Sequence, residues 1–336
     1  MIQIEGIISS DPAASAFTDE GDISEEVEHR ELSIGSAQHG SRIDKALVEL
    51  LPEFSRSYLQ QLIEIGRVRL QSALVNKASL KVKAGENLLV ELRPTPQSQA
   101  FRPEPMSLNV VHEDAHLLVI DKPAGLVVHP APGNWSGTLL NGLLAHDVGM
   151  SQVPRAGIVH RLDKDTSGLM VVAKTRLVMD ALVQAIAARE VSRQYFAVAQ
   201  RTWSHAPQIT VDAAIGRDPR NRLRMAVVNL ESGHGKSAKT DIVLLDTGSK
   251  GSFVRCILHS GRTHQIRVHM AHLGHPLVGD VVYGGSVVPE MSRQALHACR
   301  LAFRHPVTDA PLVFESSPPD DVKGLMAAWG LSYNAA

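Results

Sequence analysis

This sequence has little cysteine and no long apolar run. Only two cysteines, Cys256 and Cys299, occur in 336 residues, and they lack the CxxC spacing of a metal or redox pair. We therefore expect both thiols to be core residues, and redox chemistry is not indicated. No apolar stretch reaches the roughly 18 residues that a membrane span needs, and the first residues lack the order of a secretory signal. These absences predict a cytoplasmic protein with no membrane part.

Acidic and basic residues balance over the whole chain but not along it. The formal net charge is -1, from 34 basic and 35 acidic residues. Residues 1–40 hold nine of the acidic residues and a single basic one, so 33 basic and 26 acidic residues remain beyond them, a net charge of +7. A basic body suits a polyanionic partner. A solvated acidic tail on a body without such a partner would give the same numbers.

Composition divides the chain into four segments. Residues 1–40 mix small and acidic residues with no sustained period, so we expect a disordered tail. Residues 41–93 begin with two apolar patterns at helical spacing, separated by Pro52, and continue as strands. Residues 94–106 contain four prolines, which predicts an extended linker. Residues 107–334 form the larger expected domain.

The larger segment has the pattern of an α+β domain. Helices are expected after Ser136 and across residues 176–189. Strands are expected at residues 108–111, 117–120, 126–128, 169–173, 193–199, 209–215, 241–245 and 253–258. Because many strands are joined by few crossover helices, we predict a largely antiparallel mixed sheet with peripheral helices.

A polar island lies between two apolar runs at residues 157–175, GIVHRLDKDTSGLMVVAKT. We expect residues 157–159 to end one buried strand and residues 169–173 to form the next, with the polar residues presented between them. Asp163 lies in this connection among charged neighbours. A carboxylate in such a place can be a nucleophile or a base. It can equally belong to a structural ion pair.

Two other motifs resemble a nucleotide-binding site and a zinc site, but each lacks residues that such a site requires. The GKS sequence at residues 235–237 resembles a phosphate-binding loop, but the motif needs glycine where Leu230 stands, so nucleotide binding is not expected. The run RTHQIRVHMAHLGH at residues 262–275 contains four histidines without a His-Glu-x-x-His pair or a nearby cysteine pair, so zinc is not expected. A helix capped by Thr263 would bury an apolar face and could carry Arg267 towards a carboxylate.

Several motifs taken together resemble the RluA-type pseudouridine synthases. In chain order they are DKPAGLVVHP, HRLDKDTSGLMVVAKT, RQYFAV, SGRTHQIRVHMAHLGHPLVGDVVYG and RQALHA. Within residues 41–93, the sequences RIDKAL, SRSYLQQLI, GRV and KVKAGE resemble the S4 RNA-binding domain, but LQSA replaces a common Val-Asn-Gly turn. The combination is similar to the large-subunit ribosomal RNA members, RluD-like most of all. It implies a small α+β S4-like RNA-binding domain at residues 41–93 and a catalytic domain at residues 107–334.

The resemblance implies roles for four residues. Asp163 matches the catalytic aspartate, and Arg161 matches the arginine that enters the RNA stack where the target base has left. Tyr195 matches the tyrosine that stacks on the flipped uracil, and Arg267 matches the arginine that pairs with the aspartate. Arg193 stands where a basic residue is usual, and no separate role is assigned to it.

The function implied is isomerisation of specific uridines to pseudouridine in large-subunit (23S) ribosomal RNA. The reaction breaks the N-glycosidic bond, rotates the uracil and rejoins it through C5, so the base must leave the helix. No redox or group-transfer step occurs, so we expect no cofactor and no metal. Ribosomal RNA is the expected partner of a monomer. Two alternatives stay open, a non-catalytic RNA-binding ribosome-assembly factor and a metal-dependent RNA hydrolase that uses the histidine run.

Overall fold

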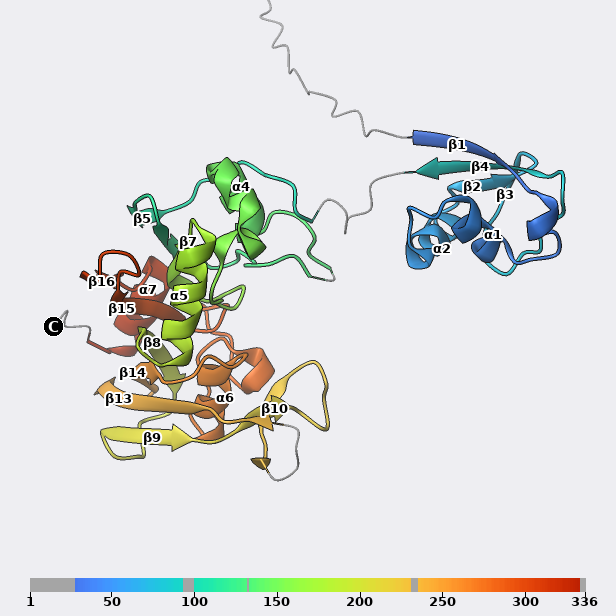
Figure 1. Cartoon of the computed structure of the whole chain (residues 1–336). Helices are drawn as coiled ribbons and strands as arrows, with labels where there is room; N and C mark the ends of the chain where they lie inside the picture. The colour runs from blue at the N-terminus through green and yellow to red at the C-terminus, as the bar shows by residue number, and fades with distance from the viewer. Residues whose placement is uncertain (1–27, 93–99, 132, 231–234, 333–336) are drawn as a thin grey trace, which may run out of the picture. The chain divides into compact units, whose positions relative to one another are not determined.

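The computed structural model describes residues 28–92, 100–131, 133–230 and 235–332. The chain divides into two compact units, Met1–Thr95 and Pro96–Ala336, each with its own sheet (Figure 1). No helix in these ranges is long and apolar enough to span a membrane. Cys256 and Cys299 are both buried free thiols, which confirms the core role expected for them.

The first unit is a four-stranded sheet with two helices. Its strand order is β1-β4-β2-β3, and its elements are β1 (Glu28–Ser33), α1 (Ile43–Leu50), α2 (Arg56–Glu64), β2 (Val68–Leu70), β3 (Ala73–Leu74) and β4 (Asn87–Leu92), with a 3-10 turn η1 (Ser36–Gln38). Ser55 caps α2 by accepting the Tyr58 amide, as the sequence pattern predicts for a helix start. Buried aliphatic residues from both helices and the central strands form one core.

The expectation that residues 1–40 form a disordered acidic tail is wrong for the residues from Glu28 onward. Strand β1 pairs antiparallel with β4 over all six of its residues, and η1 follows it. The six residues are EHRELS, mostly exposed, so they are held by backbone hydrogen bonds and show no alternating apolar signal. Residues 1–27 of the expected tail lie outside the described residues.

The second unit is built on a nine-stranded sheet of order β5-β6-β7-β15-β8-β14-β13-β9, with β16 paired to β15. Its elements are β5 (Val110–Glu113), β6 (Leu117–Lys122), α4 (Leu139–His146), η2 (Val148–Gln152), η3 (Pro154–Gly157), β7 (Ser167–Ala173), α5 (Arg176–Ala187), β8 (Ser192–Gln200), β9 (Gln208–Asp212), β10 (Ile215–Arg217), β11 (Met225–Val227), β12 (Gly235–Lys236), β13 (Lys239–Thr247), β14 (Gly251–Leu258), α6 (Gln265–His272), η5 (Val281–Tyr283), β15 (Leu296–Arg304), β16 (Pro311–Glu315) and α7 (Asp320–Trp329). A small sheet of order β11-β10-β12 accompanies it.

One parallel contact joins two antiparallel halves of the large sheet. Strand β15 pairs parallel with β7 at Ser167 and Gly168, and antiparallel with β8 on its other side. The other pairings in this sheet are antiparallel. Together with the helices, this arrangement confirms the predicted α+β class with a largely antiparallel mixed sheet.

Neighbouring residues of a strand point to opposite faces of the sheet, and both faces here carry buried apolar residues. Helices therefore pack on both faces. Leu118 and Ile120 pack in the cluster that contains the leucines of α4 and the apolar side of α6. Leu117 and Val119 pack in the cluster that contains α5. The apolar side of α7 packs with β8 and β14 residues in a third cluster.

Two of the strand segments expected in this unit do not form. Residues 126–128 form no strand, because the carbonyls of Val127 and Val128 accept the first amides of α4. Residues 157–159 do not end a strand: Gly157 is the last residue of the 3-10 turn η3, and Ile158 makes one isolated bridge. Within the expected linker, residues 100–106 form no helix or strand, and Asn141 of α4 donates to the carbonyls of Ala100 and Arg102. Residues 93–99 lie outside the described residues.

Candidate active site

A cavity of about 640 Å³ lies in the second unit where the loop before β7 meets the start of α6. Its lining includes Asp163, Arg161, Tyr195 and Arg267, the four residues singled out from the sequence. The structure therefore brings all four around one space, although they come from three separate segments of the chain: the connection before β7, strand β8 and helix α6. Their roles stay predictions.

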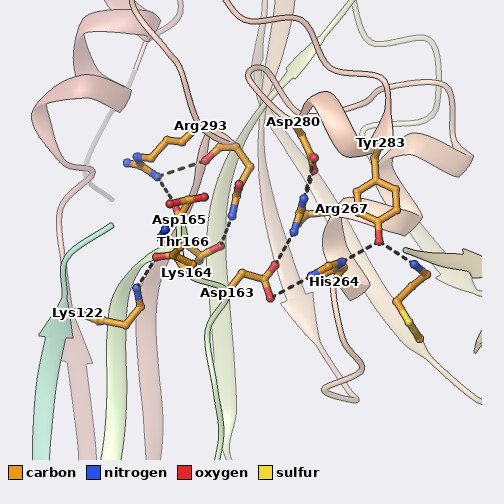
Figure 2. Close-up of polar contacts among 12 residues, drawn as sticks. Lys122, Asp163, Lys164, Asp165, Thr166, His264, Arg267, Asp280, Tyr283 and Arg293 are labelled. Atoms are coloured by element: carbon orange, nitrogen blue, oxygen red, sulfur yellow. Dashed lines mark hydrogen bonds and ion pairs between the residues drawn. The ribbon is translucent and has the colours of Figure 1, made fainter. Parts of the chain in front are cut away.

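Asp163 sits in the connection between η3 and β7 with its carboxylate partly open to solvent. Its side chain is 19% exposed. Oδ2 accepts a hydrogen bond from Nη1 of Arg267 at 3.0 Å, and Oδ1 lies 3.8 Å from Nε2 of His264 (Figure 2). One carboxylate oxygen is thus tied to a guanidinium while the other has no hydrogen-bond donor of normal length among the described residues.

A buried lysine and a partly buried arginine hold the backbone that follows Asp163. Lys122 is fully buried, and its Nζ donates to the carbonyls of Pro123, Leu126 and Lys164. Arg293 donates to the carbonyl of Asp165 at 2.9 Å (Figure 2). Burial lowers the pKa of Lys122 to about 8. The aspartate loop is therefore fixed by the interior of the unit before any substrate arrives, which is what an electrostatically pre-organised site requires.

Arg267 projects from α6, a helix buried on most of its sides. Nε and Nη2 of Arg267 donate to the two carboxylate oxygens of Asp280 at 2.7 and 2.8 Å, which leaves Nη1 for Asp163. Although burial opposes the charged form, the hydrogen bonds and negative charge of Asp280 raise the pKa of Arg267. The ring of Tyr283 lies 5.0 Å from Cζ, within cation–π range. The guanidinium is thus charged and fixed in orientation.

His264 replaces Thr263 as the residue that precedes α6, so the predicted cap is wrong. His264 has a left-handed backbone with φ of 56° and makes no side-chain cap. Its ring turns instead to the Tyr283 hydroxyl, 2.8 Å from Nδ1, and that hydroxyl accepts the amide of Met225. Burial, and then the positive charge of Arg267, lower the pKa of His264 against the opposing effect of Asp163. The imidazole is therefore neutral at neutral pH.

Tyr195 forms part of the cavity wall from the centre of β8. It is 6% exposed and pairs with Cys256 of β14 on one side and Ala298 of β15 on the other. Burial raises the pKa of its phenol to about 12, so the hydroxyl keeps its proton. A ring held by two neighbouring strands offers a rigid surface against which a planar base can stack.

The positive charge of the cavity comes from arginine. Six arginines and a single carboxylate, Asp163, line it. Two of the four histidines in the lining, His129 and His160, contribute no charge at neutral pH, because burial lowers the pKa of His129 to about 4 and that of His160 to about 3. Such a cavity attracts a polyanion at any pH near neutrality.

The histidine run does not converge on one point. His269 contacts Thr240 Oγ1 and the carbonyl of Ala213, and His275 contacts the carbonyl of Gln200. Within the described ranges, no three His, Cys, Asp or Glu side chains are grouped as metal ligands would be. Each of these histidines therefore serves a local hydrogen-bonding role.

Sequence reasoning assigned no place in this site to three of its residues, Asp280, Tyr283 and His264. Asp280 lies between apolar neighbours in the sequence VGDVV, and a carboxylate in such a run needs a partner when it is buried. That signal could have been read, but not the identity of the partner. His264 was considered only as one of the four histidines of the run at residues 262–275, and Tyr283 carried no signal in the sequence that set it apart.

Comparisons with known proteins agree with the geometry. The family model described as RNA pseudouridylate synthase matches residues 116–272, and the S4 domain model matches residues 41–88. A protein of Neisseria meningitidis named ribosomal large subunit pseudouridine synthase D is 46% identical, over 93% of this chain and 86% of its own length. A protein of the same name from Nitrosomonas europaea is also 46% identical, over 89% of this chain and 87% of its own.

A solved structure is similar as well. The human protein titled RNA Pseudouridylate Synthase Domain Containing 1 matches with a TM-score of 0.51 and 28% identity, over 67% of this chain and 90% of its own. Sequence identity above 40% over nearly the whole chain, a matching catalytic-domain model and a matching fold lead to one conclusion. This chain belongs to the RNA pseudouridine synthase family, whose members isomerise uridine within RNA.

Proposed function

We propose that this protein converts specific uridines of large-subunit (23S) ribosomal RNA to pseudouridine, with Asp163 as the essential carboxylate. The observation that carries the proposal is the solitary carboxylate of the cavity, held by a buried arginine beside a buried tyrosine in a basic wall. The substrate is taken from the names of the relatives, which share nearly the full length of this chain. The proposal includes action as a monomer in the cytoplasm.

The four residues of the cavity have different roles in flipping the uridine and isomerising it. The uridine leaves the RNA helix, which costs a few kcal/mol of stacking. Arg161, exposed at the cavity, fills the vacated position, and Tyr195 supplies a replacement stack of roughly 1–3 kcal/mol. Asp163 assists cleavage of the bond between N1 and C1′, and Arg267 holds it in place. The uracil turns, C5 bonds to C1′, and the hydrogen on C5 leaves as a proton while N1 gains one.

The S4-like unit offers a second set of RNA contacts. Asp44 is fully buried and accepts hydrogen bonds from Arg42, Arg56 and Gln60, and these bonds, that from Arg42 first, lower its pKa. The two arginines are about half exposed and held in one orientation by this carboxylate. Fixed, exposed guanidinium groups suit phosphate recognition, since the cost of ordering them is already met.

The test is release of tritium from C5. Large-subunit ribosomal RNA transcribed with uridine labelled at C5 is incubated with the protein, and small-subunit ribosomal RNA serves as the control. The proposal expects release from the first RNA only, because forming the new glycosidic bond expels the C5 hydrogen. Tight binding without release would favour the ribosome-assembly factor, and release that stops in chelator would favour metal-dependent chemistry.

Arginines at the cavity also predict a salt dependence. Arg155 and Arg189 line the cavity, are exposed, and have no side-chain hydrogen bond or ion pair among the described residues. RNA affinity falls as the salt concentration rises, with a slope of log affinity against log salt of about −0.7 for each phosphate contact with a single strand. If Arg155 and Arg189 each contact one phosphate, replacing both by Gln should make this slope less negative by about 1.4. Filter binding at several salt concentrations measures the slope.

A matched control exists on α5 for this measurement. Arg176 is exposed like the other two but is paired with Asp180. Arg176→Gln should leave the salt slope unchanged. Equal slopes for the double variant and the intact protein would mean that Arg155 and Arg189 make no phosphate contacts.

A further inference from the structure

Arg193 is a buried cation without a counter-ion. Its residue is 5% exposed, and it lies on β8 two residues before Tyr195. Among the described residues it has no hydrogen bond and no ion pair, and its Nε is a fully buried donor without an acceptor. Burying a guanidinium without a partner is costly. A ligand that supplies the missing negative charge and hydrogen-bond acceptors would remove this cost.

The side chain lies in the wall of the cavity. Arg193 lines it together with Tyr195, since residues two apart on a strand point to the same face. Gly261, also in the lining, makes room for it, because a Cβ built on Gly261 would lie 2.9 Å from Nη1 of Arg193. A larger residue at position 261 would push the guanidinium out of this place.

The carboxylate in the cavity does not neutralise Arg193. Asp163 is already paired with Arg267, and Arg193 lies outside ion-pair distance of it. The positive charge of Arg193 is nevertheless close enough to lower the pKa of His160 and to oppose the rise in that of Tyr195. The cavity thus contains an uncompensated positive charge beside the surface on which the base would stack.

We propose that Arg193 binds the phosphate of the uridine that has left the helix. The inference rests on the proposed function and extends it from the base to its backbone. A phosphate supplies the negative charge and the oxygen acceptors that Nε and the terminal nitrogens lack. Arg193 is a substrate-binding residue that recognises the flipped nucleotide whatever the sequence around it.

The proposal makes opposite predictions for stability and for activity. Arg193→Met should raise the melting temperature of the RNA-free protein, because it removes an unpaired buried charge. The same variant should lower kcat/KM by about 10- to 100-fold, and Arg193→Lys should recover part of the loss. Arg300→Met, which removes an arginine of β15 that is paired with Glu315, serves as the control and should leave kcat/KM unchanged.

A neutral phosphate locates the contact. A short ribosomal RNA fragment is made with a methylphosphonate 5′ to the modified uridine, a second with it 3′ to that uridine, and a third with it several nucleotides away. One of the two methylphosphonates next to the uridine should weaken binding of the RNA to the intact protein. The Arg193→Met variant should bind that RNA and the unmodified RNA with equal affinity. The distant substitution should affect both proteins alike.

Two results would overturn the inference. A lowered melting temperature in Arg193→Met would show that the side chain supports the fold. The second result concerns RNA affinity. If each adjacent methylphosphonate weakened the binding of Arg193→Met by the same factor as that of the intact protein, Arg193 would not contact either phosphate. Binding and melting need no turnover, so they test Arg193 even if tritium release fails and the proposed reaction is wrong.

Discussion

Replacing Asp163 by Asn is expected to reduce pseudouridine formation by roughly four orders of magnitude or more, the scale of losing an essential reacting group. Asparagine has the same shape and can still accept the hydrogen bond from Nη1 of Arg267. It lacks the negative charge and the basic oxygen that the chemistry requires. RNA binding should stay within about threefold, since the arginines of the cavity are untouched. Tritium release and filter binding on the same preparation measure the two quantities.

The matched control for this substitution is Asp180→Asn. Asp180 is also paired with an arginine, but on the exposed side of α5 outside the cavity lining. Its substitution should leave tritium release unchanged. Full release from Asp163→Asn would mean that another group performs the chemistry and that the aspartate is structural.

Arg267→Met is expected to lower the free energy of unfolding of the second unit by about 3–5 kcal/mol, the usual cost of breaking a buried ion pair from one side. The substitution leaves Asp280, whose side chain is 1% exposed, without its two hydrogen bonds from Arg267. Adding Asp280→Asn should recover most of the loss, because the stranded charge is then gone. Activity should not return in the double variant, since Asp163 has still lost its partner.

Unfolding of this unit can be followed selectively. All three tryptophans, Trp135, Trp203 and Trp329, belong to the second unit, so their fluorescence in urea reports that unit alone. Arg176→Met, which removes an exposed pair, should change the free energy of unfolding by less than about 0.5 kcal/mol. A double variant no more stable than Arg267→Met would show that the unpaired carboxylate is not the cause.

The features that the sequence predicted well are those with a local pattern. Alternation over residues 193–199 and helical spacing over residues 176–189 predicted β8 and α5 within a few residues. The segment around Asp163 could be recognised because charged residues between two apolar runs are costly unless they are paired or functional. The resemblance to the pseudouridine synthases is confirmed by the family models and the relatives.

The features that escaped prediction depend on contacts distant in sequence. The partner of Asp280 is 13 residues away on α6, and the orientation of that helix depends on tertiary packing. Residues 126–128 have the apolar composition of a strand, yet their carbonyls cap α4. Arg193 was noticed only as a basic position. That it lacks a counter-ion is a fact about the interior that neither composition nor spacing can reveal.

The central place of β15 in the sheet sets the order in which the protein becomes functional. This strand begins at Leu296 yet lies between β7 and β8, and it joins His297 to Ser167 across 130 positions of the chain. A nascent chain still missing β15 carries β7 and β8 as two unjoined edges, and contacts of such long range form slowly. Tyr195 then has a neighbour on one side only. The enzyme therefore completes its own uridine site only after β15, which is made long after β7 and β8, has left the ribosome.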